Sequence, residues 1–286
     1  MNIFNEFVSR AKNKSANIGV GLGDSEHYNL NILNEGLEFV KKSNSNIYFF
    51  GNKTSIGNIS QRSSFKKKKS RIFLVESEEP EKEMIKQLKN MVIDAIVRGS
   101  LSSSEFLKNV KKFFDIPEIN RLALLETSKG FQFFYGPVGI DECNSYEKKI
   151  MFIKKAIRVL ESLKIKPQIS VLSGGRIGDV GRDPHVDETI RNAVDIVEYF
   201  KREDPNLAIS HDEILIEKAI EKKSNLIIAP DGISGNLIYR TLVHLGEGKA
   251  YGAIYMDIDR VIIDTSRVGN QSEIYGALTV ALGLVS

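Results

Sequence analysis

The stretch from residue 229 to residue 274 decides the fold of this chain. It contains APDGISGNLIYR at 229–240, AYGAI at 250–254 and IIDTSRVGNQSEI at 262–274. The first segment follows an apolar strand and opens a helix at a Gly-Asn turn, and the last places Asp-Thr-Ser-Arg directly after another apolar strand. Backbone N–H groups, a hydroxyl and a guanidinium therefore gather in one short part of the chain. Such a set is typical of a site for a phosphate-like anion.

Strand-like and helix-like segments alternate along the rest of the chain. Apolar runs with strand character lie at 16–22, 46–50, 70–75, 95–97, 122–126, 131–135, 169–172, 207–209, 226–229, 251–255 and 261–263. Segments with helical apolar spacing lie at 32–42, 78–92, 102–114, 146–163, 187–202, 212–223, 235–245 and from about 273. This alternation predicts an α/β fold with a mostly parallel sheet and helices on both faces. The Ser-Lys-Gly turn after 122–126 predicts an antiparallel hairpin, so we expect a mixed sheet.

The length and composition indicate a soluble protein of two domains. A chain of 286 residues exceeds the usual size of one domain, and Gly136–Gly139 (GPVG) is the best candidate hinge in its middle. The net charge of +3, from 40 basic and 37 acidic side chains, argues against a dedicated nucleic-acid binder. Cys143 is the only cysteine in the sequence, so neither an internal disulfide nor a cysteine-based zinc site is expected. Because the sequence has no signal-like or membrane-spanning apolar run, we expect a cytoplasmic protein without a membrane partner.

Three candidate sites follow other predicted strands, where open α/β sheets bind their ligands. Residues 19–24 (GVGLGD) match the dinucleotide fingerprint poorly, and packing in a tight turn is the favoured interpretation. Arg98 and Ser100, followed by three further serines, are equally consistent with holding an oxyanion and with helix capping. Residues 173–179 (SGGRIGD) are consistent with a phosphate-binding loop and with a flexible surface loop.

The opening stretch is the fourth candidate site. Asn236 stands at the start of the predicted helix, where it either caps the helix or contacts a ligand. Glu273 lies seven residues after Ser266, a spacing that can return a carboxylate to the same cleft. An ion pair between Asp264 and Arg267 is the structural alternative. With both segments present in order, we favour a functional site.

Two other charged clusters favour structural interpretations. Asp183, His185 and Asp187 place two carboxylates and one histidine in one loop, but helix capping and solvated charge are the simpler roles. The lysine run 66–69 favours a solvated loop over an anion or RNA site. We therefore expect no metal site and no nucleic-acid partner.

Residues 231–240 (DGISGNLIYR) resemble the Pro-Asp…Gly-Asn…Tyr-Lys segment of the phosphate acetyl/butyryltransferases, and residues 264–267 (DTSR) resemble their Asp-Leu-Ser-Arg signature. Over its whole length, the chain is more similar to the MtxX-type methanogen marker proteins, a branch of that superfamily whose members are labelled methyltransferases. The segments 97–103 (VRGSLSS), 122–127 (LALLET) and 173–179 (SGGRIGD) carry this second resemblance.

The resemblance implies a two-domain fold of the isocitrate/isopropylmalate dehydrogenase type, with the site in an interdomain cleft. The C-terminal segment would return to the first domain. Residues 1–137 and about 252–286 would then form the first α/β domain, and residues from about 138 to 251 the second. The resemblance also implies a methanogenic archaeon as the source and a homodimer.

The resemblance also assigns roles to individual residues. In the acyltransferases, the Ser-Arg pair contacts the acyl phosphate and coenzyme A, and an acid seven residues after the serine is a candidate general base. Carried over, Ser266 positions the tetrahedral intermediate, Arg267 neutralises phosphate charge, and Glu273 replaces the family's aspartate. Val268-Gly269 stand where Gly-Cys commonly follows the Ser-Arg pair. The other residues expected to bind substrate are Arg98, Ser100, Ser173, Arg176, Asn236 and Asp264.

Three functions stay open at this point. The first is a transferase whose cleft binds a small phosphate- or coenzyme A-containing substrate, with no covalently bound cofactor. The second is a non-catalytic or accessory protein of methanogen methyl transfer, with a methyltransferase or corrinoid protein as its partner. The third, a dehydrogenase of the same fold class, is least favoured because the sequence lacks the dinucleotide fingerprint and a metal-binding carboxylate cluster.

Overall fold

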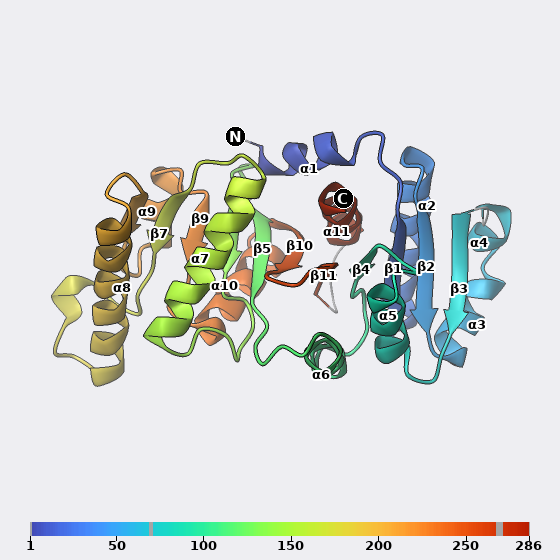
Figure 1. The fold of residues 1–286 in the computed structure, drawn as a ribbon, viewed down its shortest axis with the longest axis horizontal. Helices are drawn as coiled ribbons and strands as arrows, with labels where there is room; N and C mark the ends of the chain where they lie inside the picture. Colours follow the sequence, from blue (N-terminus) through green and yellow to red (C-terminus); the bar gives the residue numbers. More distant parts are fainter. Residues whose placement is uncertain (1, 69–70, 267–270, 286) are drawn as a thin grey trace. The chain divides into compact units, whose positions relative to one another are not determined.

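The computed structural model describes residues 2–68, 71–266 and 271–285. By their internal contacts, the residues divide into two compact units. The first unit comprises residues 2–119 and 250–286, and the second comprises residues 120–249. In Figure 1 the second unit runs from green through yellow to orange. The chain thus leaves the first unit once and returns to it with its last strands and helix.

A mixed sheet organises the first unit. Its strands are β1 (Asn17–Leu22), β2 (Asn46–Gly51), β3 (Ile72–Glu76), β4 (Ala95–Val97), β10 (Lys249–Tyr255) and β11 (Val261–Asp264). They lie in the order β3-β2-β1-β4-β11-β10, and β10 alone among these strands pairs antiparallel, with β11. The chain builds outward from β1 to β3 and then crosses back to β4 on the other side of β1. This reversal is the topological switch point at which such sheets bind ligands.

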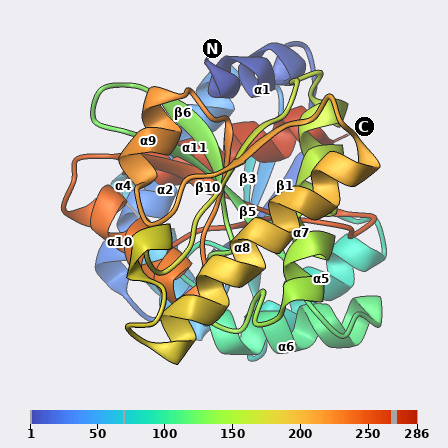
Figure 2. The same ribbon diagram turned by 90° about the vertical axis from the view of Figure 1, so that its left-hand side faces the viewer.

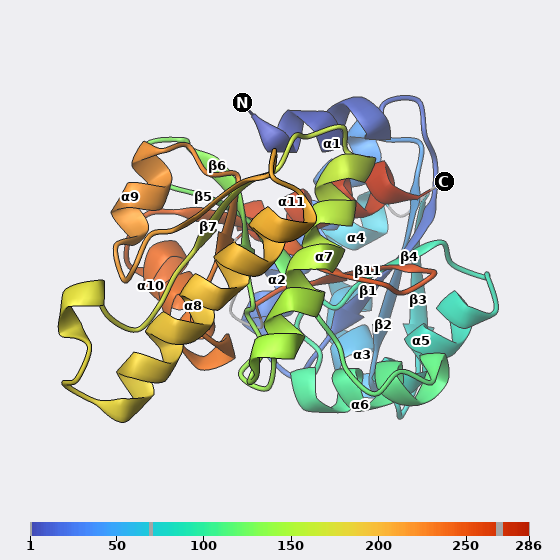
Figure 3. The ribbon, with the colours of Figure 1, turned by 60° about the vertical axis from the view of Figure 1, so that its left-hand side comes forward.

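Helices cover both faces of this sheet. They are α1 (Ile3–Ala11), α2 (Glu26–Lys42), α3 (Lys53–Gln61), α4 (Ser63–Lys68), α5 (Pro80–Lys89), α6 (Ser103–Phe114) and α11 (Gln271–Leu284). Contacts join α11 to α1 and α2, and they join α5 to α6. Figures 1 and 3 show α11 and α6 on opposite sides of β4 and β11. On the α5–α6 face, Phe50, Met84 and Phe106 belong to one buried apolar cluster.

The second unit contains five strands that are neighbours in sheet order. Its strands are β5 (Arg121–Glu126), β6 (Gln132–Gly136), β7 (Gln168–Val171), β8 (Ala208–His211) and β9 (Leu226–Ile228), in the order β5-β6-β9-β7-β8. The β5–β6 pair is antiparallel, and the other pairs are parallel. The helices are α7 (Tyr146–Ser162), α8 (Pro184–Glu203), α9 (Ile216–Glu221) and α10 (Gly232–His244), with a 3₁₀ turn at Ile177–Asp179. Figure 2 shows α7 and α8 side by side, and they are in contact.

The predicted α/β class, with mostly parallel strands in a mixed sheet, is confirmed, and so is the hairpin. The unit boundaries differ from the predicted domain limits. Residues 120–137 were expected in the first domain, but β6 pairs with β9, so this hairpin belongs to the second unit. The expected hinge at Gly136–Gly139 consequently lies inside the second unit.

Several helix boundaries also differ from the prediction. The helix α10 starts at Gly232, because the Asp231 carboxylate accepts the N–H groups of Ile233 and Ser234. Asn236 is therefore inside the helix and does not cap it. The lysine run expected to form a loop is helical through Lys68. Among the helices of residues 2–68, 71–266 and 271–285, none has the length and apolar character needed to cross a bilayer.

Candidate functional site

The carboxyl ends of β4 and β11 form a braced corner in the first unit. The two strands are parallel neighbours, so Arg98 after β4 comes next to Asp264 at the end of β11. The Arg98 side chain is buried, and its Nε donates to Asp264 Oδ1. Its Nη1 donates to the carbonyl oxygen of Leu101 at 2.6 Å, and its Nη2 donates to that of Thr265. Arg98 thus joins the two strand ends, and its direct contact with a ligand stays a prediction.

Thr265 adds a second set of bonds to this corner. Its N–H donates to Asp264 Oδ1 at 3.1 Å, and its hydroxyl donates to the carbonyl oxygen of Gly99 at 3.0 Å. Asp264 therefore accepts from both Arg98 and Thr265 and serves as the centre of the brace. The Asp264 carboxylate forms an ion pair with Arg98, which the sequence did not reveal. Arg267 itself lies outside the described residues.

Glu273 returns to the same corner from the first turn of α11. Its Oε1 accepts the backbone N–H of Ser266 at 2.8 Å, and the residue is 1% exposed. The spacing of seven residues thus does bring the carboxylate to Ser266. A glycine is required nearby at Gly252, because its φ is +89° and a Cβ there would lie 2.4 Å from a methyl carbon of Ile263. The catalytic roles of Ser266 and Glu273 stay predictions.

The β1 and β4 loops meet at the switch point. Ser100 is buried; its hydroxyl accepts the N–H of Gly23 at 2.8 Å and donates to Asn29 Oδ1 at 2.7 Å. The Asn29 amide in turn donates to the carbonyl oxygen of Gly23 at 2.8 Å. A Cβ on Gly23 would lie 2.2 Å from the carbonyl oxygen of Ser100. The glycine run 19–24 therefore serves close packing of two loops, which was its favoured interpretation.

A pocket of about 520 Å³ opens beside these loops. The charged residues that line it are Asp24, Glu78 and Glu81, and no cation is among the described residues that do so. The Asn52 amide donates to Asp24 at 3.2 Å, and Glu81 accepts the N–H of Ser102 at 3.2 Å. Because carboxylates repel phosphate, this pocket does not itself suit an anion.

The Ser-Gly-Gly loop of the second unit is pinned from within. Ser173 is fully buried; its hydroxyl donates to the carbonyl oxygen of Gly175 at 2.7 Å and lies 2.8 Å from His211 Nε2. Because the Ser173 hydroxyl proton is used in the bond to Gly175, His211 must donate its own N–H to the Ser173 oxygen. His211 therefore cannot accept the Ser173 proton, and it does not activate Ser173 as a nucleophile. Burial lowers the pKa of His211 below its usual value, against the opposing effect of two neighbouring carboxylates. Arg176, farther along this loop, is exposed, and its N–H donates to Asp179 at 2.9 Å.

The Gly-Asn motif of α10 packs against the segment after β6. The Asn236 amide donates to the carbonyl oxygen of Val138 at 2.9 Å. A Cβ on Gly232 would lie 1.8 Å from the carbonyl oxygen of Gly139, and one on Gly235 would lie 1.9 Å from that of Pro137. Only glycine permits this approach, so the motif has a packing role in the second unit whether or not a ligand binds there.

Lys149 is a buried polar residue of the second unit that the sequence analysis missed. Lys149 on α7 is buried, and burial lowers the pKa of its ammonium, opposed mainly by Cys143 and Asp231. The Tyr135 hydroxyl at the end of β6 is buried without a hydrogen-bond partner among the described residues. Burial, together with Asp231, raises the Tyr135 pKa far above its usual value. A lysine on the apolar stripe of α7, in register with Phe152 and Ile153, was the available signal.

Two acidic side chains near the start of α8 accept backbone N–H groups. The Asp183 carboxylate accepts the N–H groups of His185 and Val186 and so caps α8, and Asp187 accepts the N–H of Gly181. Asp183 thus has the capping role that the sequence favoured, and Asp187 holds the loop before the helix. Within residues 2–68, 71–266 and 271–285, no group of histidine, cysteine and acidic side chains is arranged to hold a metal ion.

Comparison with known proteins identifies the family. A protein of Methanosarcina mazei described as "Putative methyltransferase mtx subunit X" is 37% identical over 280 residues, which cover 97% of this chain and 92% of that protein. The chain belongs to this family. No family model matches the MtxX-type chain.

The MtxX-type chain is also related to phosphate acetyltransferases. It is 24% identical to the phosphate acetyltransferase of Borreliella burgdorferi over 221 residues, 68% of this chain and 61% of that protein. Its fold is similar to that of a phosphotransacetylase from Streptococcus pyogenes, with a TM-score of 0.71 at 14% identity over 99% and 98% of the two chains. A 4-hydroxythreonine-4-phosphate dehydrogenase-like structure from Salmonella typhimurium, at a TM-score of 0.55 and 11% identity over 94% and 99%, shares the fold more distantly. The predicted resemblance and fold type are thereby confirmed.

Proposed function

We propose that this MtxX-type protein is a transferase that binds a phosphate- or coenzyme A-containing substrate at the corner that holds Ser266 and Glu273, and that Arg267, the next residue in the sequence after Ser266, takes part in binding. One observation carries the proposal. The Glu273 carboxylate is buried and accepts the Ser266 N–H at 2.8 Å, so an acid and a hydroxyl residue are held together beside the strand end. General acid–base chemistry requires such a fixed carboxylate within reach of the reacting proton.

Each residue of this corner has a distinct task in the proposal. Glu273 removes a proton from the attacking group of the substrate, and the Ser266 hydroxyl donates to the oxygen on which charge develops. Arg267 pairs with the phosphate. Arg98 and Asp264 are positioning residues, because they fix the corner through bonds within the chain.

The comparisons support the transferase class more than any particular transferred group. The related enzymes are named for acetyl transfer to phosphate, and the family relatives are named methyltransferases. The replacement of Gly-Cys by Val268-Gly269 after the Ser-Arg pair favours a substrate other than that of the acetyltransferases. The proposed substrate is therefore a molecule that carries a phosphate group, and the proposed reaction is a group transfer.

A ligand panel with the variant Glu273→Gln tests the proposal. Coenzyme A, acetyl phosphate, inorganic phosphate and a methyl donor are compared by thermal shift, since a ligand at about 100 Kd stabilises the folded state by about 2.7 kcal/mol. Glutamine keeps the acceptor for the Ser266 N–H but cannot take a proton. We expect Glu273→Gln to retain the ligand-induced thermal shift and to catalyse the proposed transfer reaction roughly 10²–10⁴-fold more slowly than the wild type. If coenzyme A, acetyl phosphate and phosphate all leave the wild type unshifted, or if the variant turns over normally, the proposal is wrong.

A second function is favoured by the name of the relatives. They are described as a subunit of a methyltransferase, which would make this protein an accessory component that associates with a corrinoid or methyltransferase protein. Analytical ultracentrifugation of the purified protein with a purified methanogen corrinoid protein tests this function. A stable complex without turnover of any phosphate ester supports the accessory role, and two independently sedimenting proteins contradict it.

A further inference from the structure

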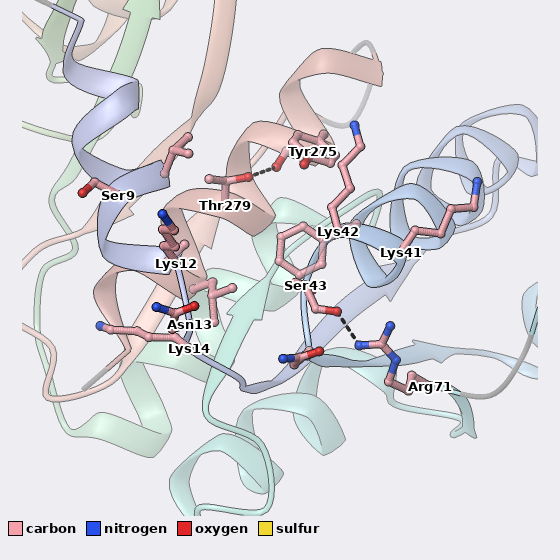
Figure 4. A pocket seen from close by; sticks show the side chains of 15 residues that line it. Ser9, Lys12, Asn13, Lys14, Lys41, Lys42, Ser43, Arg71, Tyr275 and Thr279 are labelled. Carbon is pink, nitrogen blue, oxygen red and sulfur yellow. Dashed lines mark hydrogen bonds between the residues drawn. The ribbon is translucent and has the colours of Figure 1, made fainter.

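A basic pocket lies between α1, α2 and α11 in the first unit. It has a volume of about 470 Å³, and Lys12, Lys14, Lys41, Lys42 and Arg71 contribute to its lining. The ends of α1 and α2 and the start of β3 meet here, at the amino edge of the sheet. The Ser266 corner lies at the carboxyl edge, so this pocket is not part of that site. In Figure 4, Lys12 and Asn13 lie at the end of α1, and Lys42 and Ser43 at the end of α2, where the Lys42 side chain runs toward Tyr275.

The charge of this pocket is one-sided. Five of the described residues that line it are basic, and none of them is acidic. Lys41 is paired with Glu38 on the same helix. Burial and the nearby Glu38 raise the pKa of Glu35, a half-buried neighbour on α2, and Lys42 opposes this rise. Positive charge therefore remains in excess.

Helix capping explains only two of these cations. Arg71 donates to the carbonyl oxygens of Val40 and Ser43 at the end of α2. Lys14 donates to the carbonyl oxygens of Gly283, at 3.4 Å, and Val285 at the end of α11. Cations at helix carboxyl ends are stabilising in this way in many proteins. These two cations fix the pocket wall and do not account for Lys12 and Lys42.

Lys12 and Lys42 are the cations available to a ligand. No hydrogen bond or ion pair involves either ammonium group within the described part of the chain. The Lys42 ammonium lies 5.2 Å from the ring centre of Tyr275, so it is held over the pocket by a cation–π contact. Two like charges in one pocket, from the separate helices α1 and α2, favour a ligand that carries more than one negative charge.

The remaining lining is apolar and aromatic. Phe39 and Tyr275 pack edge to face with ring centres 5.9 Å apart, and Val8 and Leu282 extend the apolar wall. Small-molecule sites combine such walls with a few polar groups that fix orientation. An inorganic anion would use only the cations, whereas an organic phosphate would also use these rings.

We infer that this pocket binds an organic molecule that carries a pyrophosphate group. Its phosphate oxygens lie between Lys12 and Lys42, and its organic body lies against Phe39 and Tyr275. Nucleoside diphosphates and coenzyme A share this chemistry, and the test separates them. The site is distinct from the Ser266 corner and does not depend on the proposed transferase reaction.

Calorimetric titration of the full chain tests this inference. Pyrophosphate, ADP and coenzyme A are titrated at constant ionic strength into the wild type and into the double variant Lys12→Gln/Lys42→Gln. The matched control is Lys108→Gln/Lys112→Gln, which removes the same charge from exposed positions on α6, on the other face of the sheet. A third variant, Arg267→Ala, removes the cation of the proposed transferase site.

We expect ADP to bind the wild type, the control and Arg267→Ala alike, and to bind the pocket double variant at least about tenfold more weakly, because two nearby charges are lost. ADP should also bind more tightly than pyrophosphate, since only ADP reaches the aromatic wall. Three results would overturn the inference: no binding of ADP or coenzyme A to the wild type at millimolar concentration, equal weakening in both double variants, or loss of ADP binding in Arg267→Ala. Binding of long RNA without binding of ADP would identify a polyanion surface in place of a pocket.

Discussion

Replacing Arg98 by methionine removes the buried guanidinium that joins the ends of β4 and β11. The side chains of Arg98 and Asp264 are 5% and 10% exposed, so water cannot replace the lost ion pair. The variant leaves Asp264 buried with the Thr265 N–H as a remaining donor, and it also deprives the carbonyl oxygens of Leu101 and Thr265 of their donor. Breaking a buried pair from one side typically costs about 3–5 kcal/mol. We therefore expect a loss of about that size in the free energy of unfolding.

An exposed ion pair provides the matched control. Arg62 pairs with Glu26, but their side chains are 40% and 53% exposed, so Arg62→Met should cost at most about 1 kcal/mol. Urea denaturation followed by far-UV circular dichroism gives both values. Because the two units can unfold separately, amide hydrogen exchange of β4 and β11 should locate the loss in the first unit. The double variant Arg98→Met/Asp264→Asn should lose less than the sum of its single variants.

One result would refute this reasoning. If Arg98→Met and Arg62→Met change the free energy of unfolding equally, and β4 exchanges no faster, then Arg98 does not brace the corner. Its guanidinium would then be available to a ligand, as the sequence first suggested.

Two further predictions concern the second unit. Gly232→Ala should destabilise the protein by more than about 2 kcal/mol, because its Cβ would lie 1.8 Å from the carbonyl oxygen of Gly139. The control Gly57→Ala has open space around its Cβ and should be neutral or stabilising by up to about 1 kcal/mol. Thermal denaturation compares the two variants, and equal effects would contradict the packing role of Gly232. Lys149→Met should stabilise the protein at pH 7, and this gain should shrink as the pH rises toward 10, because the lowered pKa of Lys149 lets the folded state lose its proton before the unfolded state does. Urea denaturation at several pH values measures this gain, and a gain independent of pH would show that the buried ammonium does not cause it.

Local pattern carried most of the fold prediction. The hairpin of β5 and β6 and the three-residue strand β4 were found because their periodicity and turn signals are local. The helix α1 was missed, since its buried face consists of Ile3 and Phe7 only and its stability comes from packing on α11, far along the chain. The first turn of α10 was missed for the opposite reason. Its glycines disfavour a helix locally, but tertiary packing requires them.

The candidate site was predictable only where it is local. The return of Glu273 to Ser266 was expected from the spacing of seven residues between them. The bond between Arg98 and Asp264 could not be found this way, because the two residues are 166 positions apart in the sequence. Only the adjacency of β4 and β11 brings Arg98 within reach of Asp264.

The most direct test of the central claim is the affinity of coenzyme A and acetyl phosphate for the variant Arg267→Ala. Arg202→Ala, which removes an exposed arginine from the end of α8, is the control for a general loss of charge. Isothermal titration calorimetry should show that Arg267→Ala weakens at least one of these ligands by more than about tenfold, since a charge-assisted contact to phosphate is lost, while Arg202→Ala leaves its affinity unchanged. Unchanged affinity of both ligands for Arg267→Ala would contradict the proposed site.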